Sequence, residues 1–217
     1  MPGEAEPMTE AGERTARRAP SLSAQLRSIS GRMPGLPTGT RATLRRLDPA
    51  APGRGVDAVI PLLIAAGVNR RAFASDEGFR RWALICHLVA TLAGTAAREV
   101  HAPVREHGAD GQMTGPRHRE REAGRRIHAA GVSETRLMRL TTARGPALVA
   151  QIARIGRFLA AAGAIPLDLT PLAHLILSEG LDETRADEAR LALARAYYAA
   201  EAGNDRDTDE IDEDARA

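Results

Sequence analysis

Arginine is the residue type whose number and spacing in this sequence could support a specific chemistry. All 30 basic residues are arginine, and no lysine is present. Several occur as pairs, or three to four residues apart, in segments expected to be helical. The candidates are Arg45, Arg46, Arg80, Arg81, Arg121, Arg125, Arg126, Arg136, Arg139 and Arg144. Such spacing predicts a shared helix face for Arg121 with Arg125 and for Arg136 with Arg139.

Two interpretations fit these arginines. Guanidinium groups bind phosphate oxygens bidentately, so a row of them would hold a nucleic-acid backbone. Alternatively, they form a solvated surface of ion pairs, each contributing only about 0–1 kcal/mol to stability. Because aromatic residues make up only 3% of the chain, we expect any nucleic-acid contact to follow the backbone rather than read bases.

The charge is unevenly distributed along the chain. Residues 202–217 contain seven acidic residues and two arginines, a net charge of −5. The whole chain carries +2, so the remainder carries +7. A basic body of this kind favours a polyanionic partner.

The sequence lacks the residue patterns of enzymes and metal sites. Its six histidines form no H-x-x-x-H or H-E-x-x-H pair, and Cys86 is the only cysteine. A single cysteine excludes an internal disulfide and a cysteine-clustered zinc site. We expect His87, His174 and Cys86 to be buried structural residues. The prediction is therefore no catalytic residue, no metal and no cofactor.

Apolar residues recur at three- and four-residue intervals, which predicts an all-α fold: a compact bundle of about eight or nine helices in two subregions. Seven helices are expected over 22–29, 40–47, 56–67, 120–130, 147–162 and 182–200 and from Thr170 onwards. Two more begin after the N-cap residues Ser75 and Ser133. Gly131 is expected to end the helix over 120–130, and Thr170 to cap the one it opens.

The predicted organisation has five parts. Residues 1–20 form a disordered tail, 21–100 an N-terminal helical region and 101–118 a loop. Residues 119–202 form a C-terminal helical region, and 203–217 form an acidic disordered tail. No run approaches the roughly 20 apolar residues of a membrane span, and the N-terminus lacks the apolar core of a secretory signal. We expect a cytoplasmic protein without membrane contact.

Four segments, in order, resemble the small subunit of type I-E CRISPR Cascade, the CasB family. The run AGRRIHAAGVSETRLMRL over 123–140 resembles the family signature: a glycine, basic residues, a small-residue turn and Ser/Asn-Glu-x-Arg. RATLRRLDP over 41–49 resembles its basic helix, and RRWALICHLVATLAG over 80–94 its central helix. AIPLDLTPLAHLIL over 164–177 resembles the segment before its last helices. The resemblance covers about residues 22–200.

This resemblance implies an all-helical, non-catalytic subunit of a crRNA-guided antiviral complex. It implies two copies per complex, contact with other Cascade subunits, crRNA and target DNA, and stabilisation of the displaced non-target strand. Arg46, Arg125 and Arg136 match basic positions of the family motifs, and Arg80 matches approximately. Arg139 and Arg144 lie on the same stretch with a looser match, and Gly145 stands where a further basic residue is expected.

Two alternatives remain open from the residues themselves. The first is a helical protein–protein adaptor that does not bind nucleic acid. The second, ranked last, is a sequence-specific helical repressor, which would need base-reading residues such as Asn or Gln. Glu134 also has two readings: it could favour the start of its helix electrostatically, the preferred reading, or pair with an arginine.

Overall fold

The computed structural model of the chain describes residues 20–48, 51–94, 100–103 and 120–214. Within these ranges the protein has nine α-helices and no strand, which confirms the all-α prediction. The helices are α1 (Leu22–Arg32), α2 (Thr38–Arg46), α3 (Val56–Ala65), α4 (Asp76–Ala93), α6 (Ala123–Ala129), α7 (Glu134–Thr142), α8 (Gly145–Ala161), α9 (Thr170–Ser178) and α10 (Glu183–Asp214). The expected N-terminal tail over 1–19 and the greater part of the expected loop, 104–118, lie outside the described residues.

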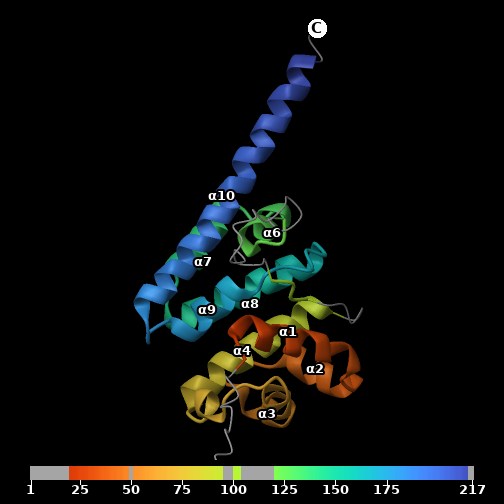
Figure 1. The fold of residues 1–217 in the computed structure, drawn as a ribbon, viewed down its shortest axis with the longest axis vertical. Coiled ribbons are helices and arrows are strands. Elements are labelled where there is room, and N and C mark those ends of the chain that lie inside the picture. The colour runs from red at the N-terminus through yellow and green to blue at the C-terminus, as the bar shows by residue number, and fades with distance from the viewer. Residues whose placement is uncertain (1–19, 49–50, 95–99, 104–119, 215–217) are drawn as a thin grey trace, which may run out of the picture.

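Helix α4 lies at the centre of the molecule (Figure 1). Every residue from Trp82 to Ala90 is buried, as expected of a helix that is apolar on nearly all sides. It packs against α1, α2 and α3 on the N-terminal side and against α8 and α9 on the C-terminal side. A Cβ atom on Gly156 of α8 would lie 2.7 Å from Leu88 Cδ1. Glycine therefore permits the close approach of α8 to α4.

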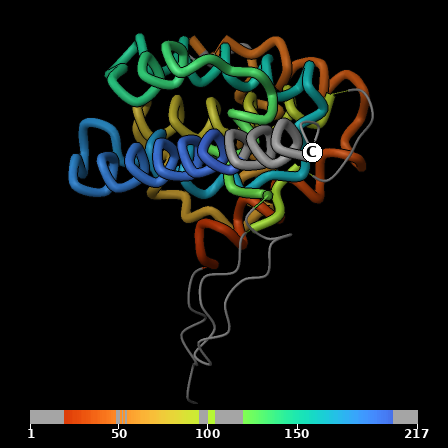
Figure 2. The backbone as a smooth tube through the Cα atoms, turned by 90° about the horizontal axis from the view of Figure 1, so that it is seen from above, coloured from red at the N-terminus to blue at the C-terminus, as the bar shows by residue number. Residues whose placement is uncertain are grey.

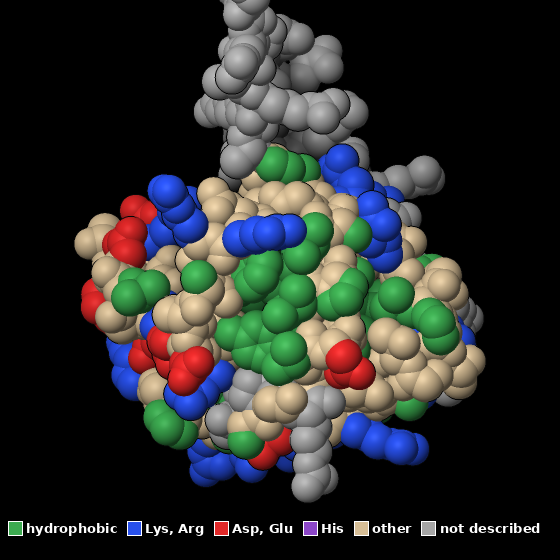
Figure 3. Space-filling view, turned by 90° about the horizontal axis from the view of Figure 1, so that it is seen from below, with side chains coloured by type: hydrophobic (Ala, Val, Ile, Leu, Met, Phe, Trp, Pro, Cys, Tyr) green, Lys and Arg blue, Asp and Glu red, His purple; other side chains and the backbone are tan. Residues whose placement is uncertain are grey.

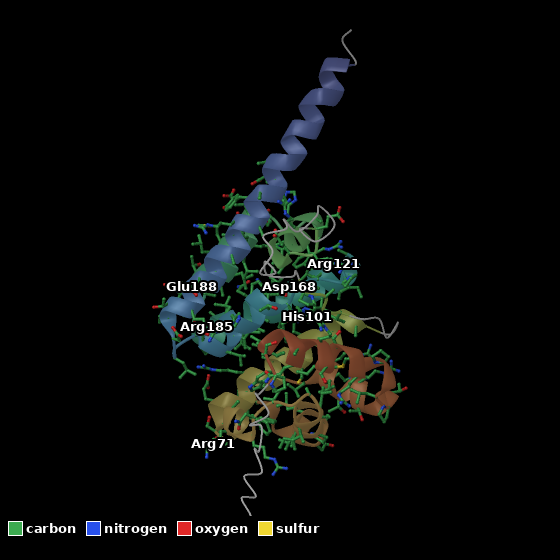
Figure 4. All side chains as sticks on the ribbon, in the orientation of Figure 1. Arg71, His101, Arg121, Asp168, Arg185 and Glu188 are labelled. Atoms are coloured by element: carbon green, nitrogen blue, oxygen red, sulfur yellow. The ribbon has the colours of Figure 1, made fainter. Side chains whose placement is uncertain are left out.

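A buried polar cluster beside α4 joins helix α1 to the segment before α9. His101 is fully buried, and its Nδ1 accepts a hydrogen bond of 3.1 Å from the Leu169 amide. This bond places the imidazole proton on Nε2, which lies 3.4 Å from Ser23 Oγ. Ser30 Oγ accepts hydrogen bonds from the amides of Val100 and His101. Figure 4 shows His101 and Asp168 at this seam, so α1 and the segment before α9 are held together by hydrogen bonds as well as apolar packing.

Several predicted helix ends are present. Ser75 Oγ accepts a hydrogen bond of 3.1 Å from the Gly78 amide, which confirms the cap of α4. Gly131 follows α6 with a φ of 72°, as a C-terminal glycine does. Ser133 occupies the N-cap position of α7, but its hydroxyl makes no capping hydrogen bond.

Helices α2 and α8 begin at Thr38 and Gly145, each two residues before the predicted start, and two further helix starts also differ from the prediction. Helix α6 begins at Ala123 rather than near residue 120, because the Asp168 amide donates to the Arg121 carbonyl (2.7 Å) and holds the preceding backbone extended. Thr170 is the first residue of α9 rather than its cap. The Asp168 carboxylate accepts from the Thr170 amide instead (2.9 Å).

Two helices run longer than predicted. Helix α1 continues through Gly31 to Arg32, and α10 continues past the expected end near Ala200 to Asp214. The boundary of the acidic tail at residue 203 stays a prediction. No proline follows Pro171, and Gly203 is the only glycine after Gly180; one glycine costs about 1 kcal/mol in a helix, which does not end it.

No helix in the described ranges combines the length and the apolar character that crossing a membrane requires.

Candidate nucleic-acid interface

The ten predicted arginines occupy three places in the fold. Three lie where α4, α8 and α9 meet, three lie at the start of α6, and four lie on α2 and α7. The structure therefore does not bring all ten together. The three places differ in whether acidic side chains already form ion pairs with the guanidinium groups.

Arg80 and Arg81, in the first turns of α4, are both ion-paired with Glu77. Arg81 Nε lies 2.9 Å from Glu77 Oε1, and its Nη1 donates to the Leu177 carbonyl of α9 at 2.8 Å. The Arg81 side chain is only 11% exposed. Arg80 Nη1 lies 3.9 Å from Glu77 Oε2 and keeps half of its surface exposed. Arg81 is therefore a structural link between α4 and α9.

Arg144 serves mainly as a connector before α8. Its Nη1 donates to the carbonyls of residues 141, 142 and 143, which satisfies the end of α7. Its other guanidinium nitrogens lie 3.9 Å from Glu179 and 3.7 Å from Asp187. Glu179 also accepts from the Gly145 amide at 2.9 Å and pairs with Arg190, whose side chain is 7% exposed. We name Arg80, Arg81, Arg144 and Arg190 with these acids the ion-paired junction.

The three arginines around α6 do not form one face. Arg121 precedes the helix, so the helical spacing predicted between Arg121 and Arg125 is wrong. Arg125 Nε lies 3.1 Å from Glu122 Oε2. Arg126 is half-buried, and its Nε has no hydrogen-bond partner within the described part of the chain. Figure 4 places Arg121 beside α6, away from the N-terminal half.

The four arginines on α2 and α7 have a different environment. Arg46 and Arg139 are exposed, and Arg45 and Arg136 are half-buried. In the described ranges none of these four forms an ion pair. Arg136 and Arg139 lie three residues apart on one helix, as predicted for a shared face.

Sequence reasoning missed two arginines on α8, Arg154 and Arg157. Both are exposed, three residues apart, and form no ion pair with a described residue. The spacing rule that selected Arg136 and Arg139 would also have selected them. They went unnoticed because they lie singly among apolar residues, whereas the other candidates lie in basic clusters.

Two contacts and one electrostatic interaction link the helices that carry these arginines. The Arg136 guanidinium stacks over the Phe158 ring of α8, 4.5 Å from its centre. Phe158 adjoins Arg157, whose charge acts on His87 of α4. His87 Nδ1 in turn lies 3.1 Å from the Leu44 carbonyl, one residue before Arg45 and Arg46. Figure 2 shows α7 and α2 along the same side of the molecule. We name Arg45, Arg46, Arg136, Arg139, Arg154 and Arg157 the basic face.

Electrostatics agree with this placement of Arg157. Burial is the main cause that lowers the pKa of His87 below its usual value, and the nearby positive charge of Arg157 lowers it further. The hydrogen bond to the Leu44 carbonyl and the charge of Asp48 act in the opposite direction. His87 is therefore the buried structural residue expected, and Arg157 lies close enough to α4 to act on it.

The face of the protein seen from below has an apolar centre. Figure 3 shows apolar side chains gathered at the centre of the face seen from below, with arginines toward its edge. Val56 and Ile64 of α3 are among the exposed large apolar residues. The arginines are therefore not spread evenly over the protein, although the composition alone would allow that.

Two further predicted residues have clear surroundings. Cys86 is fully buried, as predicted, and burial raises the pKa of its thiol to about 12. Glu134 lies in the first turn of α7 and accepts a hydrogen bond of 2.8 Å from the Tyr198 hydroxyl. Within the described ranges Glu134 pairs with no arginine, which agrees with the helix-start reading.

The fold and the surface together define a class: a small all-helical protein with an arginine-rich face. In the described part of the chain no three His, Cys, Asp or Glu side chains are placed to hold a metal ion. Residues 40–198 match the family described as CRISPR-associated protein Cse2.

The chain therefore belongs to the Cse2 family, also called CasB, the small subunit of type I-E Cascade. Members of this family are non-catalytic structural subunits of that complex. Neither the curated proteins nor the solved structures include a significant match to the chain.

Proposed function

We propose that this Cascade subunit binds the sugar–phosphate backbone of the displaced non-target DNA strand through its basic face. The observation that carries the proposal is the set of six arginines on α2, α7 and α8 that form no ion pair with a described acid. Their donors are available to phosphates, and binding needs no internal ion pair to break. Among the described aromatic rings only Phe158 is stacked with one of these arginines, and Arg136 covers its face. The face therefore suits contact with the backbone regardless of sequence.

The same proposal covers the wider assembly. The subunit acts in the cytoplasm with a crRNA-bearing complex, beside a second copy of itself. Base pairing by the guide supplies sequence specificity, and this chain supplies electrostatic support for the strand that pairing displaces. The proposed ligand is single-stranded DNA rather than a duplex operator, because arginine dominates the basic face and Gln151 of α8 is the only Asn or Gln on α2, α7 and α8.

Single-stranded DNA binding across a salt series tests the proposal. We compare the wild-type chain with the triple variant Arg46→Ala, Arg136→Ala and Arg157→Ala. Each neutralised phosphate contributes about 0.7 to the slope of log K against log salt, so the variant should lose about 2 from that slope. The matched control is Arg71→Ala, Arg185→Ala and Arg195→Ala, which removes the same charge from exposed sites outside α2, α7 and α8.

An equal loss of slope in both triple variants would mean that net charge, not the basic face, carries the binding. If the wild-type chain binds no DNA at low salt, alone or in the assembled complex, the adaptor interpretation replaces this one.

A further inference from the structure

A pocket of about 210 Å³ opens at the ion-paired junction, between the first turns of α4 and α8 and the end of α9. Its apolar lining comes from Leu84, Pro146, Leu148, Val149 and Ile176. Leu84, Leu148 and Ile176 are each 3% exposed, so they form a floor that belongs to the core. The pocket therefore offers an incoming apolar group an apolar floor that the core holds in place.

The walls of the pocket are held in place before anything binds. Arg81 is fixed by Glu77 on α4 and by the Leu177 carbonyl on α9. Glu179 is fixed by Arg190 and by the Gly145 amide. Each wall thus joins two elements of the fold. A group that enters the pocket would not need to order these side chains, which lowers the entropic cost of association.

The volume of the pocket limits what can occupy it. A cavity of about 150 Å³ holds one benzene molecule, whereas pockets for cofactors and drug-sized ligands span about 300–1,000 Å³. The space at the junction therefore suits one branched or aromatic side chain.

The rim of the pocket favours a polypeptide over a nucleic acid. The charged side chains that line the pocket are two acids, Glu77 and Glu179, and two arginines, so the lining gives a polyanion no net attraction. No aromatic ring lines the pocket, so a nucleobase would have no stacking partner. Arg80 is half exposed and holds Glu77 only at 3.9 Å, which leaves donors for carbonyl or carboxylate oxygens of a partner. Alternating positive and negative groups around an apolar centre are typical of a protein-binding hot spot.

We propose that this pocket receives a leucine-, methionine- or phenylalanine-sized side chain from a different subunit of the complex, flanked by an acidic residue that contacts Arg80. The proposal rests on membership of a multisubunit complex and is independent of DNA binding by the basic face. It assigns Arg80 and Arg81, first predicted as nucleic-acid ligands, to subunit assembly.

The test changes the size of a side chain that lines the pocket. Val149→Phe places a ring in the cavity, Val149→Ala enlarges it, and Ala150→Phe adds the same ring at the next, exposed position of α8. Each chain is co-expressed with the remaining subunits and guide RNA of its system, and its content in the purified complex is measured by native mass spectrometry. We expect Val149→Phe to lower incorporation at least tenfold and the other two variants to remain within twofold of wild type.

Thermal unfolding of each free chain guards against a folding defect. If Val149→Phe lowers the melting temperature, Arg80→Glu replaces it, because reversal of a half-exposed rim charge leaves the core intact. Arg80→Glu should then lower incorporation to a similar degree. Wild-type incorporation of both variants would overturn the proposal.

Other occupants give distinct results. A loss of single-stranded DNA affinity in the free Val149→Phe chain would indicate a nucleobase in the pocket. A change in the oligomeric mass of the free chain would indicate a second copy. Either result contradicts the proposal. A wild-type chain that enters the complex but binds no DNA would contradict only the function proposed for the basic face.

Discussion

The basic face and the ion-paired junction are both rich in arginine, yet they differ in what the guanidinium groups contact. At the junction, Arg81 and Arg190 are almost buried and bonded to carboxylates from their own or neighbouring elements. On the basic face, Arg46, Arg139 and Arg157 are exposed and form no ion pair with a described acid. Arginine pairs in a sequence therefore identify candidate phosphate ligands only after their acidic neighbours in space are known.

The contrast has an energetic basis. Breaking a buried pair leaves an uncompensated charge, which costs about 3–5 kcal/mol, whereas an exposed arginine contributes little to stability. Arg81 and Arg190 are consequently committed to the fold. Arginines on the basic face are free to exchange water and counterions for phosphates, which is the source of salt-dependent binding.

The largest expected effect is on stability at the junction. Glu179→Ala removes one of the three acids that pair with Arg190 and the acceptor of the Gly145 amide. It should therefore lower the free energy of unfolding by about 2 kcal/mol. Urea denaturation measures this. The matched change on the basic face, Arg157→Ala, should remain within about 0.5 kcal/mol of wild type. Equal effects at the two sites would remove the distinction between them.

The next effect concerns DNA affinity. Arg80→Ala, Arg81→Ala and Arg144→Ala together remove the same charge as the triple variant of the basic face. Because these side chains already contact acids or carbonyls, the slope of log K against log salt should change by less than about 0.7, the contribution of one phosphate. Filter binding with a single-stranded oligonucleotide measures it. A decrease near 2 would place the DNA at the junction instead.

A smaller effect is expected from the ring beneath Arg136. Phe158→Leu removes the cation–π contact, which is worth about 0.5–1 kcal/mol at an exposed site, and should weaken single-stranded DNA binding about two- to threefold through Arg136. A double-mutant cycle with Arg136→Ala checks this. If the two changes are additive, Phe158 does not position Arg136.

The smallest effect is a change in titration at His87. Its lowered pKa means that the unfolded chain binds the proton more readily, so stability should decrease as the pH falls below about 6.5, by at most about 1.4 kcal/mol per pH unit. Arg157→Ala removes one cause of the lowering, so the pKa of His87 should move upward in an NMR titration. An unchanged pKa would mean that the charge of Arg157 does not act on His87.

Much of the fold could be predicted from local sequence. Periodic apolar residues and the caps at Ser75 and Gly131 indicated the helices, because capping depends on neighbouring residues alone. The start of α9 could not be predicted in this way, since both Thr170 and Asp168 are credible caps and only the structure shows which one bonds. The His101 cluster was missed for a different reason. Its partners lie about 70 residues away on both sides.

The site could be predicted only in part. Arg46 and Arg136 were selected by motif and spacing, and the structure gives them surroundings that suit phosphate contact. Arg81 and Arg144 were selected by the same rule, yet they form ion pairs with Glu77 and Glu179. Glu179 lies 35 residues beyond Arg144 in the sequence, so no local pattern could have revealed that pairing.

Site-specific photocrosslinking within the assembled, target-bound complex tests the central claim most directly. A benzophenone side chain would replace Arg154 on the basic face in one complex and Arg80 at the junction in another, with a radiolabelled non-target strand. The account predicts strong crosslinks to that strand from position 154, and crosslinks from position 80 to a protein subunit only. Strand crosslinks from position 80 and none from position 154 would contradict it.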